Sequence, residues 1–299
     1  MWTKDNIADK TGKVVIITGA NSGIGYYSAL ALYEKGAHII LACRNLHSAE
    51  NAITKIKSLK GTGTLEARKL DLASLESVKE FAKLFIQDYK KLDILINNAG
   101  VMTPPSAKTA EGYELQFGVN YLGHFALTGY LYPLLKNTTG ARVVNVTSLA
   151  YTLGSINFNN FRLNFPYDAS REYNQSKLAN ILFTFELQRR IDIVGDSILS
   201  VAAHPGVTKT ELSRNMSEEN INSAVQMYGP LMDAWQGALP SLYAATEPNL
   251  ESSGFFGPDS DGGLRGYPAQ TEVTDVGRDY NTSKKLWDFA EMATGVPYP

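Results

Sequence analysis

Residues 18–25 read T-G-A-N-S-G-I-G, a glycine-rich stretch between an apolar run and a helical pattern. It closes the apolar run Val14 to Thr18 and leads directly into a helical pattern from about Ile24 to Lys35. At a strand-to-helix turn, glycines let the backbone approach a pyrophosphate, whose negative charge is favoured by free N–H groups at the helix start. Ordinary loops between a strand and a helix also contain glycines, so both interpretations stay open. The candidate cofactor contacts here are Gly19, Asn21, Ser22, Gly23, Ile24 and Gly25.

On either side of this turn, short runs rich in β-branched residues alternate with longer amphipathic stretches, which is typical of βαβ units. Nearly continuous apolar runs, as expected of strands buried on both faces, cover 14–18, 38–43, 65–70, 94–97, 142–147 and 197–203, with a weaker seventh at 254–256. Helical periodicity is clearest at 49–59, 75–89 and 176–193. The sequence predicts one α/β domain over residues 1–299, a doubly wound Rossmann fold with about seven, mostly parallel, strands and helices on both faces.

The carboxyl-terminal third is less regular. Ser213, Asn215 and Ser217 precede a helical stretch that contains Met, Tyr and Trp, and we expect a substrate lid at about 208–250. Residues 254–299 are rich in Gly and Pro, which predicts a turn-rich tail before a last helix over 283–292.

Composition limits the class of ligand. With 44% hydrophobic and 19% charged residues and a net charge of -2, the chain lacks the basic excess that nucleic-acid binding requires. The single cysteine, Cys43, forms no internal disulfide, and without a Cys/His cluster we expect no metal. Residues 1–10 contain no apolar run, so we expect a cytoplasmic protein without a membrane anchor and with a small-molecule substrate.

The end of the second apolar run, A-C-R-N at 42–45, suggests which dinucleotide binds. In a dinucleotide fold this position meets the adenosine ribose, where an acidic side chain would bind the 2′-hydroxyl of NAD. Arg44 instead offers a charged, planar fork suited to a phosphate, with Asn45 beside it, although a solvated arginine is also common there. The sequence therefore predicts NADP(H).

Three further strand ends carry candidate contacts. The acid after the third run either accepts from the adenine amino group or caps the helix that begins near Ser74. Small and amide-bearing residues after the fourth run let the chain pass close to a cofactor, and a turn after the sixth run is suited to the nicotinamide carboxamide. These candidates are Asp71, Leu72, Asn98, Ala99, Gly100, Pro205 and Gly206.

A tyrosine followed four residues later by a lysine places both side chains on one helix face. The pattern occurs at Tyr132–Lys136, Tyr173–Lys177 and Tyr280–Lys284. Only Tyr173 opens the helix after the fifth run, downstream of Ser148 at that run's carboxyl end, where open α/β sheets bind ligands. We interpret the other two pairs as structural.

The chemistry of this pair follows from charge. A phenol has a pKa of about 10, and a nearby ammonium would lower that pKa, so that Tyr173 acts as general acid in reduction and general base in oxidation. Ser148 either hydrogen-bonds the substrate oxygen or caps a turn. Asn120 has poor helix propensity in a predicted helix, which is a slight hint of another role. The histidines at 38, 47, 124 and 204 have no acid or nucleophile at suitable spacing, and we interpret them as structural.

The motifs T-G-x-x-x-G-x-G, N-N-A-G and Y-x-x-x-K stand here in this order, and with them the chain resembles the short-chain dehydrogenase/reductase family. Within it, L-A-C-R-N at 41–45, L-D-L-A-S at 70–74 and S-K-L-A-N at 176–180 are similar to the branch of retinol dehydrogenases, WW-domain oxidoreductase and protochlorophyllide reductase. The resemblance covers residues 13–290.

This resemblance implies hydride transfer between NADPH and a carbonyl carbon, with a catalytic tetrad of Asn120, Ser148, Tyr173 and Lys177. It implies that Lys177 also binds the nicotinamide ribose and that Asn120 holds a water for proton relay. The implied cofactor contacts are Gly19, Ser22, Ile24, Arg44, Asp71, Asn98, Tyr173, Lys177, Val207 and Thr208.

Two departures from the plainest family members shape the expected substrate. The segment between Ser148 and Tyr173 is longer, and we expect residues 151–170 to rim the substrate pocket. The expected lack of an amino-terminal anchor favours small to medium lipophilic aldehydes or ketones over a retinoid. A catalytically silent NADP(H)-binding or sensing protein, and an epimerase or dehydratase, remain alternatives; a homodimer and a homotetramer both stay open.

Overall fold

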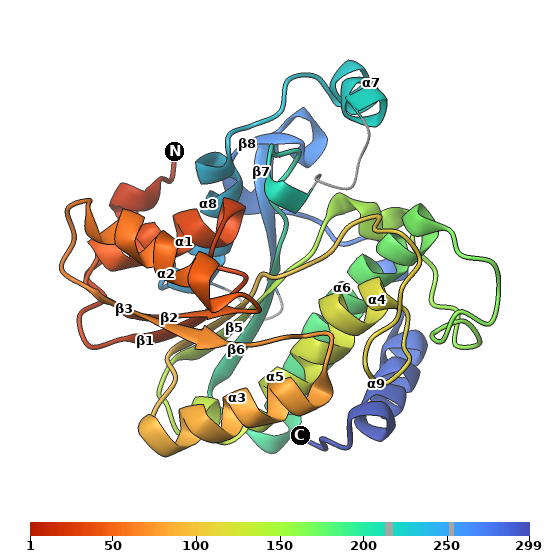
Figure 1. The fold of residues 1–299 in the computed structure, drawn as a ribbon, viewed down its shortest axis with the longest axis horizontal. Coiled ribbons are helices and arrows are strands. Elements are labelled where there is room, and N and C mark those ends of the chain that lie inside the picture. The colour runs from red at the N-terminus through yellow and green to blue at the C-terminus, as the bar shows by residue number, and fades with distance from the viewer. Residues whose placement is uncertain (213–217, 251–253) are drawn as a thin grey trace.

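The computed structural model describes residues 1–212, 218–250 and 254–299 (Figure 1). Within these residues one eight-stranded sheet has the order β3-β2-β1-β4-β5-β6-β7-β8, and only the β7–β8 pair is antiparallel. The strand order reverses between β1 and β4, the point outside which such sheets bind ligands. The strands are β1 (Val14–Thr18), β2 (His38–Cys43), β3 (Thr64–Lys69), β4 (Ile94–Asn97), β5 (Ala141–Val146), β6 (Ile198–Ala203), β7 (Phe255–Ser260) and β8 (Arg265–Gln270).

The doubly wound fold predicted from the sequence is confirmed, with eight strands where about seven were expected. The first six predicted runs coincide with β1 to β6 to within one residue at each end. The strand β8, which contains Gly266 and Pro268, was missed because both residues are depleted in strands and are accommodated at a sheet edge. Residues 254–299 therefore complete the sheet and supply a helix, in addition to forming turns.

Helices cover both faces of the sheet (Figure 1). One apolar core joins the sheet to α1 (Gly23–Glu34), α2 (Leu46–Lys57) and α8 (Ala234–Thr246). The other joins it to α3 (Leu75–Asp88), α5 (Gly123–Lys136), α6 (Ala169–Val194) and α9 (Tyr280–Thr294). The helix α9 packs on α6, and its Trp287 lies against Phe125 and Phe183.

Short elements near the site complete the chain. The helix α4 (Leu115–Phe117) continues into a π-helical turn, η2 (Gly118–Leu122), which leads into α5. A 3-10 turn, η3 (Leu149–Leu153), follows β5. π-helical turns are rare overall, but those that occur are often found at functional sites. The turn η2 therefore marks this segment as a candidate functional site.

The predicted lid at 208–250 is only partly compatible with this arrangement. Residues 213–217, with Ser213, Asn215 and Ser217, lie outside the described residues. The helix α8 belongs to the core rather than to a cover, because Ala238 and Leu242 are buried against the sheet. The helix α7 (Glu218–Tyr228) stands away from the sheet (Figure 1), and for α7 the lid remains a prediction.

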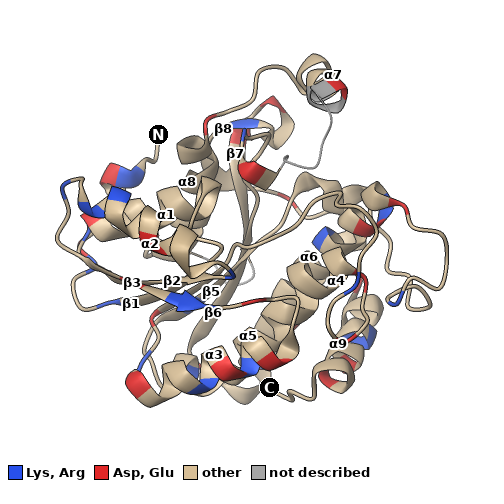
Figure 2. Cartoon of the chain, in the orientation of Figure 1, with Lys and Arg blue, Asp and Glu red and all other residues tan. Residues whose placement is uncertain are grey.

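Charges of both signs are interspersed over the helices and loops in the view of Figure 2. Across the three described ranges, no helix combines the length and the apolar character needed to cross a lipid bilayer.

Candidate active site

The glycine-rich turn between β1 and α1 has the backbone geometry that only glycine supplies readily. Gly19 and Gly23 have φ of +67° and +54°. A Cβ at Gly25 would lie 2.6 Å from both Asn98 Nδ2 and the Gly19 carbonyl oxygen, so a side chain there would displace the turn. Ser22, the N-cap of α1, makes no side-chain capping bond, and Ile24 lies in the first turn of α1. The first N–H groups of α1 thus face the turn, as an anion site requires.

The segment after β4 braces this turn. The Asn98 side chain donates to the Thr18 carbonyl oxygen at 2.8 Å, and the backbone N–H groups of Asn98 and Ala99 each donate to the Thr18 hydroxyl at 2.9 Å. Asn97 instead points into the core and donates to Asn145 Oδ1. The N-N-A-G motif is therefore divided, with Asn98 to Gly100 at the turn and Asn97 inside the sheet layer.

At the adenosine end, Arg44 is exposed at the end of β2 and makes no hydrogen bond or ion pair with any residue in the described ranges. Asn45 is the N-cap of α2 and accepts from the Ser48 N–H at 3.0 Å. Asp71 accepts from the Ala73 N–H at 3.0 Å. The N-cap of α3 is Ser74, so the alternative that Asp71 caps that helix is wrong. Leu72 is buried, with its carbonyl oxygen close to Gly123.

The Tyr173–Lys177 pair lies at the start of α6, beside the end of β5. Both side chains are buried, and the Lys177 Nζ lies 5.6 Å from the centroid of the Tyr173 ring. Lys177 donates to the Val146 carbonyl oxygen at 3.3 Å, and Ser148 is hydrogen-bonded to the Tyr173 phenol. Ser148 also accepts from the Ala150 N–H at 3.2 Å and so caps η3. The expected cap is thus present, and the hydrogen bond from Ser148 to a substrate oxygen stays a prediction.

Asn120 lies in η2 and is fully buried. Its Oδ1 accepts from the Val101 N–H at 2.8 Å, and its Nδ2 donates to the Val101 carbonyl oxygen at 3.0 Å and to Ser176 Oγ at 2.9 Å. A Cβ at Gly100 would lie 3.3 Å from Asn120 Oδ1 and 3.7 Å from Lys177 Nζ. The ends of β4 and β5, η2 and the start of α6 therefore converge on one place next to the glycine-rich turn.

The turn after β6 is held by the β7–β8 hairpin. Gly206 has a φ of +65°, and the Val207 N–H donates to the Leu264 carbonyl oxygen at 2.8 Å. The Thr208 hydroxyl donates to the Pro205 carbonyl oxygen at 2.8 Å. Residues 205–208 are thus fixed at the same sheet edge as the groups described above.

A family model described as short chain dehydrogenase matches residues 13–221 of this sequence. The chain belongs to the short-chain dehydrogenase family. It is 38% identical to human retinol dehydrogenase 14, over 95% of this chain and 87% of that protein, and 40% identical to mouse retinol dehydrogenase 11, over 96% and 87%. The crystal structure of an uncharacterized protein from Mycobacterium paratuberculosis is 37% identical, with a TM-score of 0.84, covering 100% of this chain and 99% of that one.

The predicted retinol dehydrogenase-like branch of this family is therefore confirmed. As a member, this short-chain dehydrogenase is an oxidoreductase that transfers hydride with a nicotinamide cofactor. Retinol is named as the substrate of those relatives, and the names say nothing about the substrate of this chain.

Burial changes the acid–base properties of the dehydrogenase's central pair. Burial raises the pKa of Tyr173 to about 12, and the hydrogen bond with Ser148 acts in the opposite direction. Burial also lowers the pKa of Lys177 to about 8. The lowering of the phenol pKa that the sequence led us to expect does not appear in the protein alone, where burial is the main cause and raises this pKa. At neutral pH the phenol keeps its proton.

The single cysteine of this short-chain dehydrogenase lies under the glycine-rich turn. Cys43 is buried at the end of β2, where its sulfur faces the backbone N–H groups of residues 19–21. Burial raises the pKa of the Cys43 thiol to about 11, although those N–H groups favour the thiolate. The thiol is therefore protonated at neutral pH.

Sequence reasoning missed a buried glutamine that joins two loops of the dehydrogenase's site. Gln116 accepts from the Thr103 N–H at 2.9 Å, and its Nε2 donates to the Ala169 carbonyl oxygen at 2.8 Å and to the Tyr167 hydroxyl at 3.2 Å. It thereby ties the loop after β4 to the segment that precedes α6. A glutamine within the apolar stretch L-Q-F was the only sequence signal for this contact.

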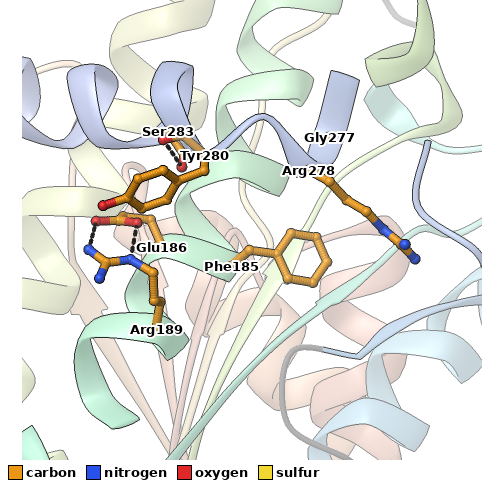
Figure 3. Close-up of a pocket in the computed structure, with 7 residues that line it drawn as sticks. All are labelled: Phe185, Glu186, Arg189, Gly277, Arg278, Tyr280 and Ser283. Carbon is orange, nitrogen blue, oxygen red and sulfur yellow. Dashed lines mark hydrogen bonds and ion pairs between the residues drawn. The ribbon is translucent and has the colours of Figure 1, made fainter. Parts of the chain in front are cut away.

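A surface pocket of about 370 Å³ lies elsewhere on the dehydrogenase, between α6 and the start of α9 (Figure 3). Tyr280 lines it with its ring 5.1 Å from the Arg189 guanidinium, and Arg189 pairs with Glu186. Arg189 follows Tyr173 by sixteen residues of α6, about 24 Å at the rise of a helix. The Tyr280–Lys284 pair therefore lies far from the converging groups, as its structural interpretation requires.

Proposed function

We propose that this short-chain dehydrogenase uses NADPH to reduce the carbonyl group of small to medium lipophilic aldehydes or ketones, or uses NADP⁺ to oxidise the matching alcohols. The observation that carries the proposal is the convergence of Tyr173, Lys177 and Ser148 beside the glycine-rich turn, at the sheet edge where such folds bind ligands.

The residues divide the chemistry as follows. A bound reduced nicotinamide supplies the hydride. Tyr173, which holds its proton at neutral pH, donates that proton to the substrate oxygen as negative charge develops there. Ser148 donates a hydrogen bond to the same oxygen. The Lys177 ammonium stabilises the phenolate that Tyr173 becomes, which offsets the cost of forming an anion in a buried site.

The residues around the glycine-rich turn fit a dinucleotide. Gly25 lets the turn pass directly against Asn98 and the Gly19 carbonyl oxygen, and the first N–H groups of α1 face the turn. Arg44 has no partner among the described residues, so its guanidinium is available to pair with the 2′-phosphate of NADP(H). We therefore assign the adenosine 2′-phosphate to Arg44.

Apolar side chains support the lipophilic substrate class. Leu153 is 78% and Phe165 is 51% exposed, and both lie in the segment between Ser148 and Tyr173. Met227 of α7 is 74% exposed. Several relatives are named for retinol, itself a lipophilic alcohol, which agrees with a substrate that needs apolar surface.

The deciding experiment follows NADPH absorbance while the purified chain meets a panel of aldehydes and ketones of increasing length, with retinal included. We expect NADPH consumption that rises with chain length up to medium-sized carbonyls. NADPH binding without consumption of any carbonyl would favour the silent binding or sensing protein. Substrate conversion without net NADPH consumption would favour an epimerase or dehydratase, and a strong preference for retinal would replace the substrate class.

Arg44→Ala tests the cofactor assignment. Because a charge-assisted contact contributes about 1.5–3 kcal/mol, we expect the Kd for NADPH to rise about 10- to 100-fold while the Kd for NADH changes little. Titration of both cofactors checks this, with Arg278→Ala as the matched control, because Arg278 is another exposed arginine and lines the surface pocket of Figure 3. Equal losses for NADH and NADPH would contradict the assignment.

The pKa of Lys177 predicts a pH dependence. Since burial lowers this pKa to about 8, the free protein loses the ammonium as the pH rises through that value, whereas Tyr173 remains protonated. We expect kcat/KM for NADPH, which reports groups of the free enzyme, to be level near pH 7 and to fall above pH about 8. A rate profile that rises through pH 9 would contradict this assignment.

A further inference from the structure

A buried histidine joins the glycine-rich turn to the π-helical turn. His124, on α5, is 2% exposed. Its Nε2 lies 2.9 Å from the Thr18 hydroxyl, 106 residues earlier in the chain, and its Nδ1 lies 3.0 Å from the Asn120 carbonyl oxygen. The histidine therefore spans the space between the end of β1 and η2.

The partners determine which ring nitrogen carries the proton. A carbonyl oxygen can only accept, so Nδ1 must be the protonated nitrogen and Nε2 must be an acceptor. The Thr18 hydroxyl already accepts from the N–H groups of Asn98 and Ala99. Its single proton can donate to Nε2 at 2.9 Å or to the Ile96 carbonyl oxygen at 3.5 Å, and the shorter distance favours Nε2. With the proton on Nδ1 and the Thr18 hydroxyl donating to Nε2, every group in this chain of hydrogen bonds is satisfied.

The ring keeps this arrangement at working pH. Burial, with a smaller effect from the Lys177 charge, lowers the pKa of His124 to about 4, although its bond to Asn120 acts in the opposite direction. The imidazole is thus neutral at pH 7 and its tautomer is fixed by Asn120 on one side and Thr18 on the other.

The two ends of this link belong to different parts of the site. Thr18 begins the glycine-rich turn, and its hydroxyl accepts from the segment after β4, so Thr18 belongs to the part of the site that would hold the cofactor. Asn120 is hydrogen-bonded to the backbone of Val101 and to the hydroxyl of Ser176, which lies in α6 between Tyr173 and Lys177. A shift of η2 would therefore displace the start of α6, which carries the proton donor Tyr173.

We propose that His124 is a positioning residue. Through its hydrogen bond with Thr18 it fixes the π-helical turn to the glycine-rich turn, and thereby sets where Asn120 and its partners lie relative to the reacting groups. Its role in turnover rests on the proposed function, but the hydrogen-bonded state of its ring does not. It never contacts the reacting atoms. Its contribution is to the placement of those atoms, which small displacements degrade strongly.

A mutant cycle tests the link. We expect His124→Leu to lower kcat about 10- to 100-fold while the Kd for NADPH changes less than about 3-fold. Thr18→Val should lower kcat to a similar extent, and Thr18→Ser, which keeps the hydroxyl, should restore most of it. Because both changes break the same link, the kcat of the double variant should be at most about 3-fold lower than that of the less active single variant.

Thr138→Val is the matched control, because Thr138 is also buried and its hydroxyl is hydrogen-bonded to Leu134 and Leu92, beyond the opposite end of α5. Its kcat should equal that of the unmodified chain. If His124→Leu merely lowered Tm and left kcat intact, or if the His124 and Thr18 effects multiplied independently, the proposal would be overturned.

A spectroscopic measurement keeps the outcome separate from that of the proposed function. In the cofactor-free protein labelled with ¹⁵N-histidine, His124 should appear at pH 7 as the neutral Nδ1–H tautomer, and Thr18→Val should shift its Nε2 signal. An Nε2–H tautomer or a charged ring would sink the inference even if carbonyl reduction were found. The expected tautomer without any carbonyl reduction would retain the link and reject the proposed reaction.

Discussion

Replacing Tyr173 by phenylalanine is expected to lower kcat for carbonyl reduction by about 10²- to 10⁴-fold, the range that a positioned general acid contributes. The change removes one oxygen atom and leaves the aromatic ring beside Lys177, whose Nζ lies 5.6 Å from the ring centroid. The Kd for NADPH should therefore change by less than a factor of about 3. Steady-state rates and cofactor titration on the same preparation measure both quantities.

The chain supplies its own control for this experiment. Tyr280 also stands four residues before a lysine, but it is half exposed and lines the surface pocket of Figure 3. Tyr280→Phe should leave kcat unchanged. Full activity in Tyr173→Phe, or an equal loss in both variants, would remove the phenol from the mechanism.

Lys177→Met is expected to have the second large effect, a fall in kcat of about 10²- to 10⁴-fold, because no cation then stabilises the phenolate in the buried site. The same change should keep or raise Tm, since it replaces a buried charge by an apolar chain of similar length. The lowered pKa of Lys177, about 8, shows that the fold disfavours its charged form.

Lys284→Met is the control for this variant, because Lys284 is exposed and pairs with Asp288. It should leave both kcat and Tm nearly unchanged. A Lys177→Met protein that loses activity together with several degrees of Tm would indicate a structural lysine instead. Thermal melts beside the rate measurements separate the two interpretations.

The sequence predicts the central sheet well because parallel strands are buried on both faces and appear as uninterrupted apolar runs. Strands β1 and β2 coincide with such runs. Strand β8 does not, because its half-exposed residues include a glycine and a proline. The core position of α8 was equally hidden, since periodicity shows that a helix has an apolar side but not which part of the molecule that side meets.

The placement of candidate residues was predictable where they follow a strand or open a helix, as Ser148 follows β5 and Tyr173 lies in the first turns of α6. The link from Thr18 through His124 to Asn120 was not, because hydrogen-bond partners distant in the chain leave no spacing to recognise. His124 was interpreted as merely structural for this reason. The direction of the Tyr173 pKa was mistaken on similar grounds, because the degree of burial that decides it depends on the whole fold.

The low reactivity of the cysteine beneath the glycine-rich turn makes the protein suitable for site-specific labelling. Thiol reagents attack the thiolate, and Cys43 is both shielded and held in its neutral form by a pKa of about 11. Since it is also the sole cysteine of the chain, a new cysteine introduced on α7 would be labelled selectively with a fluorophore or spin label, without first mutating the native residue.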